Sequence, residues 1–170
     1  IYRRLVADKL AVLMNVDHAD ARTLLSDASF VVNRQGRVKN AKTGAGVHIA
    51  SPRLGDGGLS LTDEGALALH KLRKVDAPTG LPQISSTAPK GVGPAWVVVD
   101  ADAEPFVRQG RNAFHGFVVA VDAWIQPSQT CLIVNQDGAL LGHGLANGTA
   151  DEFRGFKKGV AVKTRGGIAL

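Results

Sequence analysis

The sequence predicts an α+β protein with a small mixed domain over residues 1–75, a connector over 76–94 and a small β-barrel over 95–170. Two observations carry this prediction. Between Trp96 and Arg165, short apolar runs and turn signals follow the order strand, helix, three strands, helix, strand, and short strands with tight turns lose their exposed edges by closing into a barrel. The stretch from Val75 to Pro94 has four prolines and no sustained periodicity, which is typical of a connector.

The mixed domain opens with two predicted helices. Apolar residues recur at helical spacing from Tyr2 to Met14 with charged residues between them, so we expect an amphipathic helix with Met14 in the core. Asp17 is placed to cap a second helix that ends by Ser29. Thr62, followed by two acidic residues, predicts the start of a third helix that runs to Arg73, because side-chain oxygens and negative charge both suit the exposed amides of a first turn.

Three strands are predicted in the sequence between the second and the third of these helices. The expected strands lie at 30–32, 47–49 and 59–61, with a turn at 34–37, a glycine break at 44–46 and a loop from Pro52 to Gly58.

The predicted barrel has the clearest turn chemistry in the chain. The Asp137-Gly138 dipeptide between two apolar runs is the strongest short-range signal for a hairpin. Thr149 and Glu152 have the spacing of a capping box, and Gly159 is placed to end the helix that follows. The remaining elements are expected as a strand at 96–99, a helix at 103–108 ending at Gly110, strands at 114–121, 131–134 and 139–145, and an edge strand at 160–163.

The composition and length of the chain restrict the classes of protein to which it can belong. The chain has 170 residues and 45% hydrophobic content, enough for one domain or two small ones, and no apolar run is long enough to span a bilayer. We therefore expect a cytoplasmic protein; the chain starts at Ile1 and not at Met, so this expectation covers only the printed residues. Cys131, the single cysteine, excludes a disulfide framework, and its place in an apolar strand predicts a small buried hydrophobe.

The net charge of +5 points toward an anionic partner. Thirteen Lys and Arg face eight acids in residues 1–90, whereas residues 91–170 hold seven of each. Within the predicted barrel most cations gather near Arg108 and near Lys157, while most acids lie elsewhere. A neutral domain can therefore still carry a basic face.

Residues 95–170 resemble the PUA domain, the RNA-binding module of pseudouridine synthases and archaeosine transglycosylases. The resemblance rests on the order and spacing of several short blocks, above all the last of them. These blocks are 96–100, 106–114, 132–135, 141–144 and 156–163. A mixed domain directly before such a module is similar to the arrangement in two-domain archaeal and eukaryotic proteins of ribosome biogenesis and in related translation factors.

Sequence signals for catalysis and for cofactors are absent. The Gly55–Gly58 stretch lacks the lysine and the strand-to-helix context of a phosphate-binding loop, and no Gly-x-Ser-x-Gly elbow occurs. The five histidines show no metal-ligand spacing, and His143 is interpreted as a satisfied strand histidine. Asp100, Asp102 and Glu104 suit a helix N-terminus better than an acid/base pair. We predict no catalytic residue, no metal and no cofactor.

The PUA resemblance implies two groups of RNA-binding residues, in the first helix with its following loop and around the last strand. The planar Arg side chain can donate two hydrogen bonds to one phosphate, and Lys provides a point charge. Gly110 would let the RNA backbone approach closely, although Gly110 also suits the C-cap of the helix. Without the resemblance the lysines would be interpreted as a solvated face. The implied residues are Arg108, Gly110, Arg111, Asn112, Lys157, Lys158, Lys163 and Arg165.

A second basic stretch is hairpin-like, and an exposed turn and an RNA contact remain equal interpretations of it. It consists of Arg34, Arg37, Lys39 and Lys42. Because few aromatic residues are expected outside the core, recognition of RNA shape and backbone is favoured over base stacking.

The sequence thus predicts a noncatalytic protein that binds structured rRNA or tRNA, in ribosome biogenesis or RNA modification. One alternative is a protein-docking subunit of a ribosome-assembly or RNA-modification complex, which an exposed apolar patch on the first helix would favour. The other is an accessory piece of an archaeosine-type tRNA-guanine transglycosylase. The particular RNA, the protein partner and the oligomeric state are not assigned, nor is whether the N-terminal domain binds RNA or protein.

Overall fold

The computed structural model describes residues 1–81 and 89–170 and divides the chain into two compact units. The N-terminal unit comprises Ile1–Lys74 and Lys90–Gly93, and the C-terminal unit comprises Val75–Pro89 and Pro94–Leu170. Part of the predicted connector, residues 82–88, lies outside the described residues. Of the rest, Val92 forms an isolated bridge with Val16 in the N-terminal unit, and the Val121 amide donates to the Gly80 carbonyl in the C-terminal unit. The domain boundaries themselves stay a prediction.

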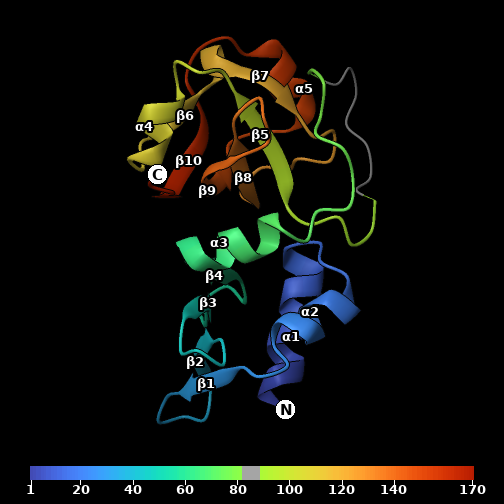
Figure 1. Cartoon of the computed structure of the whole chain (residues 1–170), viewed down its shortest axis with the longest axis vertical. Coiled ribbons are helices and arrows are strands. Elements are labelled where there is room, and N and C mark those ends of the chain that lie inside the picture. The colour runs from blue at the N-terminus through green and yellow to red at the C-terminus, as the bar shows by residue number, and fades with distance from the viewer. Residues whose placement is uncertain (82–88) are drawn as a thin grey trace. The chain divides into compact units, whose positions relative to one another are not determined.

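In the N-terminal unit, three helices accompany a four-stranded antiparallel sheet of order β1-β2-β3-β4 (Figure 1). The predicted caps are confirmed: the Asp17 carboxylate accepts from the Ala19 amide, and Thr62 Oγ1 accepts from the Gly65 amide. Met14 is buried as predicted. The elements are α1 (Tyr2–Leu13), α2 (His18–Leu24), β1 (Ser29–Val32), β2 (Val38–Lys42), β3 (His48–Pro52), β4 (Leu59–Leu61) and α3 (Asp63–His70).

The prediction for this unit was wrong at three places, the first of which is the end of α3, at His70 and not at Arg73. β2 was not expected as a strand, because Lys39, Asn40 and Lys42 dilute its apolar pattern to the two buried residues Val38 and Ala41. Pro52 belongs to the end of β3 and not to the following loop. Pro52 pairs with Leu59 in the register of β3 and β4.

The C-terminal unit is a six-stranded sheet of order β6-β10-β9-β8-β5-β7, antiparallel except for the pair β5 and β8. Its two edge strands, β6 and β7, are separated by only three residues, so the sheet curls into a nearly closed barrel (Figure 1). The elements are β5 (Ala95–Val99), α4 (Glu104–Arg108), β6 (Ala113–Phe114), the 3-10 helix η1 (His115–Phe117), β7 (Val118–Val121), β8 (Thr130–Val134), β9 (Leu140–Ala146), α5 (Ala150–Gly155) and β10 (Val160–Gly167).

Two turn predictions for this unit are confirmed and three expectations are corrected. The strand expected at the edge, 160–163, is part of β10, which lies between β6 and β9. The Asp137-Gly138 hairpin joins β8 to β9, and Thr149 and Glu152 form a complete capping box. However, α5 ends at Gly155; Gly159, at φ +89°, instead turns the chain into β10. The run at 114–121 is not one strand, because His115 turns inward to a buried position and η1 interrupts the run.

Candidate nucleic-acid interface

The helix α4 is fixed at both ends. At its start, Asp100 Oδ1 accepts from the backbone amides of Asp102 at 3.0 Å and Ala103 at 3.3 Å. Asp100 therefore stabilises the turn before α4, whereas the N-cap of the helix is Ala103, so the expected side-chain cap at the helix terminus itself is not formed. At its end, Gly110 adopts φ +85°, a conformation that costs glycine little, and redirects the chain toward β6.

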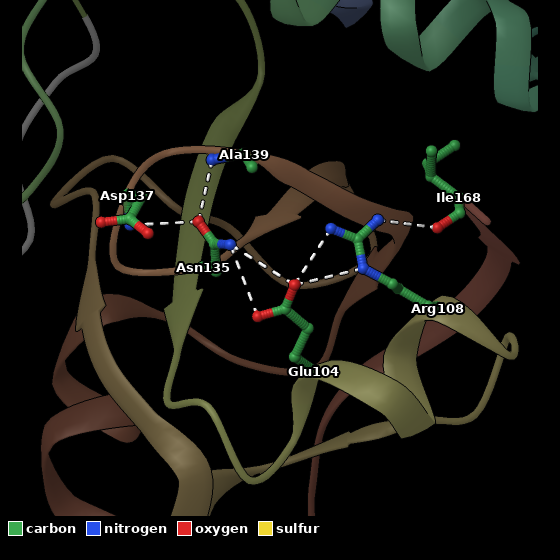
Figure 2. A network of polar contacts seen from close by, with 6 residues as sticks. All are labelled: Glu104, Arg108, Asn135, Asp137, Ala139 and Ile168. Atoms are coloured by element: carbon green, nitrogen blue, oxygen red, sulfur yellow. Dashed lines mark hydrogen bonds and ion pairs between the residues drawn. The ribbon is translucent and has the colours of Figure 1, made fainter. Parts of the chain in front are cut away.

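A polar network joins α4 to two other parts of the barrel (Figure 2). Arg108 Nη2 and Nε donate to Glu104 Oε1 at 3.0 and 3.2 Å, and Nη1 donates to the Ile168 carbonyl at 3.0 Å. Asn135 Nδ2 donates to the same carboxylate, while Asn135 Oδ1 accepts from the amides of the β8–β9 turn. The Arg108 side chain is only 14% exposed, so its guanidinium is engaged in the fold. Contact of Arg108 with RNA stays a prediction.

Glycines let the end of α4 lie directly against the last strand. A side chain at Gly167 would overlap the Arg108 carbonyl and the Gly110 amide nitrogen. A side chain at Gly142, on the neighbouring strand β9, would meet the Gly166 carbonyl oxygen at 2.7 Å and a Val107 methyl at 3.1 Å. The close approach of α4, β9 and β10 therefore depends on the absence of a Cβ at these positions.

The loop after α4 is also bonded to β10. Asn112 Oδ1 accepts a hydrogen bond from the Thr164 amide at 3.0 Å. Just beyond it, β6 pairs with β10 in the register Ala113 with Val162 and Phe114 with Val160. The structure thus brings together the two groups of residues that the sequence predicted, the loop at 110–112 and the last strand.

Five cations of these two groups are exposed on the surface. Arg111 lies in the loop after α4, with its guanidinium carbon 5.7 Å from the centre of the Phe106 ring, within cation–π range. Within the described residues, none of the five has a carboxylate at ion-pair distance, whereas nearby Arg154 pairs with Asp151 at 3.6 Å. These free cations are Arg111, Lys157, Lys158, Lys163 and Arg165.

The second basic stretch, expected to be hairpin-like, lies in the turn between β1 and β2 and along β2 itself. Asn33 closes its turn: its Oδ1 accepts from the Gln35 and Arg37 amides, each at 3.0 Å. Arg34, Arg37 and Lys39 are exposed and Lys42 is half-buried. Contact of this hairpin with RNA stays a prediction.

The expectation of few exposed aromatic residues was wrong. Phe106, Phe114 and Phe117 are 48%, 46% and 37% exposed, and they line one hollow together with Ala103, Arg111 and Asn112. The apolar pattern suggested core positions, but a two-residue strand and a 3-10 turn direct these rings outward. One signal was available in the sequence, because three of the six phenylalanines fall within twelve residues that also contain Arg111.

The described residues offer little for catalysis. No group of three or more His, Cys, Asp or Glu side chains in this part of the chain is placed to hold a metal ion. Burial raises the pKa of Cys131 to about 12, so its thiol stays protonated and unreactive. His143 is buried in β9, as expected. Across residues 1–81 and 89–170, no helix combines the length and apolar character needed to cross a bilayer.

His115 is the buried histidine that sequence reasoning left without a role. Its ring lies edge-on to Phe153 and Phe156, with centroid distances of 5.0 and 5.6 Å. Burial lowers its pKa, against a smaller opposing effect of the Glu152 charge. Its Nδ1 is buried and has no hydrogen-bond partner among residues 1–81 and 89–170, which fits a neutral ring in an aromatic environment.

Comparison with known families supplies the identity of the barrel. Residues 95–168 match the sequence profile of the PUA domain. These residues are a PUA domain. The match covers the barrel from β5 to β10 and includes both groups of predicted site residues.

The sequence is similar to a named group of archaeal proteins along most of its length. It is 35% identical to the tRNA-guanine(15) transglycosylase of Thermococcus kodakarensis over 142 residues, which are 84% of this chain and 22% of that protein. It is 33% identical to the same protein of Pyrococcus abyssi, over 88% of this chain and 23% of that protein. The similarity therefore includes the N-terminal unit as well as the PUA domain, but the chain spans less than a quarter of these relatives.

Solved structures support the fold of both units. A hypothetical protein of Pyrococcus horikoshii matches 97% of this chain and 89% of its own at a TM-score of 0.65 with 18% identity. A conserved PUA domain protein of Thermoplasma acidophilum matches 75% of this chain and 68% of its own at a TM-score of 0.52 with 19% identity. A PUA domain after an N-terminal α+β unit is thus the fold of this chain.

Proposed function

We propose that this chain is a noncatalytic RNA-binding protein that recognises structured tRNA or rRNA through its PUA domain. The observation that carries the proposal is the PUA match itself, which spans residues 95–168. Relatives named for tRNA modification, matched along both units, favour tRNA over rRNA as the first RNA to test.

The charge distribution of the domain supports this function. The loop after α4 meets β10 through the bond between Asn112 and Thr164, so Arg111 and the cations of β10 belong to adjacent segments. No carboxylate competes with phosphate for these cations. Both Arg and Lys side chains form charge-assisted hydrogen bonds with phosphate oxygens. We propose Arg111, Lys157, Lys158, Lys163 and Arg165 as phosphate ligands, with Gly110 and Asn112 shaping the loop.

The experiment is an equilibrium titration of an archaeal tRNA transcript by fluorescence anisotropy. We expect affinity to fall with salt, with a slope of log K against log salt of about −0.9 for each phosphate neutralised in a duplex. The triple variant K157E/K158E/K163E should bind much more weakly and with a shallower slope. Unchanged affinity in this variant would exclude this face as the RNA site.

A charge-matched control separates local binding from general attraction. The variant R22E/K71E/K90E reverses three exposed cations of the N-terminal unit and changes the net charge by the same amount. We expect it to keep most of the affinity, and unchanged thermal unfolding should accompany both triple variants. Equal losses in the two variants would mean that binding follows net charge and not the proposed face.

A second candidate function, protein docking, is favoured by the outer face of α1. Tyr2, Leu5 and Val12 recur at helical spacing and are 38%, 44% and 76% exposed, which is a large apolar stripe for a helix whose other face is already buried. Because the similar transglycosylases hold a region similar to most of this chain within a much longer chain, the partner to test is such an enzyme lacking that region. Restored guanine exchange in tRNA on adding this chain, and its loss with Leu5→Asp, would support docking.

A further inference from the structure

The N-terminal unit contains a hollow of about 390 Å³ between α1, the turn that joins β1 to β2 and the loop that joins β3 to β4. Val38 and Pro52 are buried in its wall, whereas Leu5 and Leu54 are 44% and 50% exposed. Exposed apolar side chains that gather at one place mark interaction sites, because water solvates them poorly. The wall of this N-terminal hollow includes Tyr2, Leu5, Arg37, Val38, Pro52 and Leu54.

Contacts within the N-terminal unit hold the walls of this hollow in place. The Tyr2 ring packs against the Phe30 ring of β1, with a centroid distance of 6.4 Å. Lys9 Nζ donates to the Gly57 carbonyl at 2.6 Å and thereby ties α1 to the loop between β3 and β4. The fold itself therefore forms the hollow, as is usual for binding sites.

The edge of the N-terminal hollow is positively charged. Between Asp27 and Asp56 the sequence has five Lys and Arg and no acidic residue. Arg53 is paired with Asp56 at 3.1 Å, whereas the exposed Arg37 has no side-chain partner in the described part of the chain. The Arg37 guanidinium therefore keeps its donors for a ligand, and a carboxylate matches their planar geometry.

Apolar walls beside a cation favour an acidic peptide over RNA as the occupant. An apolar side chain is stabilised when it leaves water for such walls, whereas a sugar-phosphate backbone would lose its hydration without new hydrogen bonds. Of the residues that line the hollow, Tyr2 alone carries an aromatic ring, so base stacking has little support. The volume lies in the range of roughly 300–1,000 Å³ that is usual for small ligands, so an apolar side chain has room to enter.

We propose that the N-terminal hollow binds an acidic peptide segment of a partner protein, which inserts one apolar side chain into the hollow and places a carboxylate on Arg37. The inference does not depend on RNA binding by the PUA domain. It rests on the second candidate function, protein docking, and gives that function a site and a peptide chemistry. The site differs from the outer face of α1, because Val12 does not line the hollow.

The test selects peptides from a phage-displayed random library on the immobilised chain. We expect the enriched sequences to share one aliphatic or aromatic residue beside Asp or Glu, and the most enriched peptide is then titrated by fluorescence anisotropy. Burial of one apolar side chain corresponds to about 10- to 100-fold in affinity, so Leu54→Asp should weaken binding by at least about tenfold. Val47→Asp adds the same charge at an exposed apolar residue outside the hollow and should keep the affinity.

The basic edge is tested by a second pair of variants. Arg37→Glu should weaken peptide binding by about tenfold, the order expected for the loss of one charge-assisted hydrogen bond. Arg22→Glu reverses an exposed cation of α2 that does not line the hollow, so it should bind the peptide as the wild type does.

A spectroscopic measurement on the wild-type chain makes the test independent of variant folding. When the selected peptide is added, the NMR signals of the backbone amides at 36–38 and 53–57 should shift, while those of the PUA domain stay unchanged. Shifts confined to other parts of the chain would overturn the inference.

The remaining outcomes separate this site from the alternatives. Enriched peptides without a shared apolar and acidic pattern, or a peptide that binds Leu54→Asp and the wild type equally, would overturn the inference. Equal losses in Leu5→Asp and Val12→Asp would assign docking to the outer face of α1 instead. A lower affinity of Arg37→Glu for tRNA, with peptide binding unchanged, would make the turn an RNA contact and would also overturn it. In each case the titration of tRNA tests RNA binding by the PUA domain separately.

Discussion

The side chain of Asn112 accepts a hydrogen bond from the backbone amide of Thr164 at 3.0 Å, across a separation of 52 residues in the chain. This bond holds the loop after α4 against β10. It therefore sets the spacing between Arg111 on the loop and Lys163 and Arg165 on the strand, three of the residues proposed as phosphate ligands.

Replacing Asn112 tests this link. We expect Asn112→Ala to lower the free energy of unfolding by about 1 kcal/mol, the usual net contribution of one hydrogen bond, since the Thr164 amide loses its acceptor. Asn112→Asp retains an acceptor at the same position and should keep most of the stability. Urea unfolding of the three proteins measures the difference. Equal stability of Asn112→Ala and the wild type would show that the bond does not fix the loop.

Arg108 and Arg111 are expected to differ in role although only two residues lie between them. Arg108 is mostly buried and bonded to Glu104 and Ile168, so Arg108→Met should destabilise the fold by roughly 1–3 kcal/mol, because a partly buried carboxylate loses its partner. Arg111→Met removes an exposed cation and should lower RNA affinity with a smaller effect on stability. Paired measurements of urea unfolding and tRNA affinity test this contrast; a larger loss of affinity in folded Arg108→Met than in Arg111→Met would contradict it.

These two arginines also illustrate how far the sequence predicts the site. The resemblance to the PUA domain implied that both belong to one site with the last strand, whereas turn chemistry at Gly110 and at Asp137-Gly138 predicted only the local elements. Which arginine faces solvent was not predictable, since it depends on Glu104 and on the Ile168 carbonyl, a contact that spans 60 residues.

The phenylalanines of the hollow escaped prediction for a related reason. An apolar run predicts burial only if the element is long enough to keep a regular face toward the core. β6 has two residues and η1 has three, so Phe114 and Phe117 turn outward while His115 between them turns inward. Similarly, β2 was missed because only Val38 and Ala41 mark its buried face.

Gly167 should tolerate no side chain. A Cβ at this position would overlap the Arg108 carbonyl and press on the Gly110 amide, both of them backbone atoms that cannot move without displacing α4. We expect Gly167→Ala to cost about 1–3 kcal/mol, the usual range for overpacking. Gly155→Ala is the matched control, because it lies in α5 with no atom within 4 Å of its Cβ, and it should be neutral or stabilise by up to about 1 kcal/mol. A comparison of melting temperatures that finds both changes equally mild would contradict the tight contact.

His115 should make the stability of the PUA domain dependent on pH. Burial among Phe153 and Phe156 lowers its pKa in the folded state below the ordinary value of 6.5, so the unfolded chain binds a proton more readily than the folded one. The contribution of His115 to stability is therefore fully present above pH 6.5 and is lost as the pH falls below that value toward the folded-state pKa.

The measurement is the melting temperature between pH 7.5 and 5.5, above the range in which most carboxylates become protonated. The wild type should lose stability over this interval, and His115→Leu should show a flatter profile because it has no proton to bind at this position. His18→Leu is the control: it removes an exposed histidine that lies 3.4 Å from Asp8 and leaves the aromatic environment of His115 intact, so its profile should still fall as the pH is lowered. Parallel profiles for the wild type and His115→Leu would mean that the buried ring is not the group that titrates.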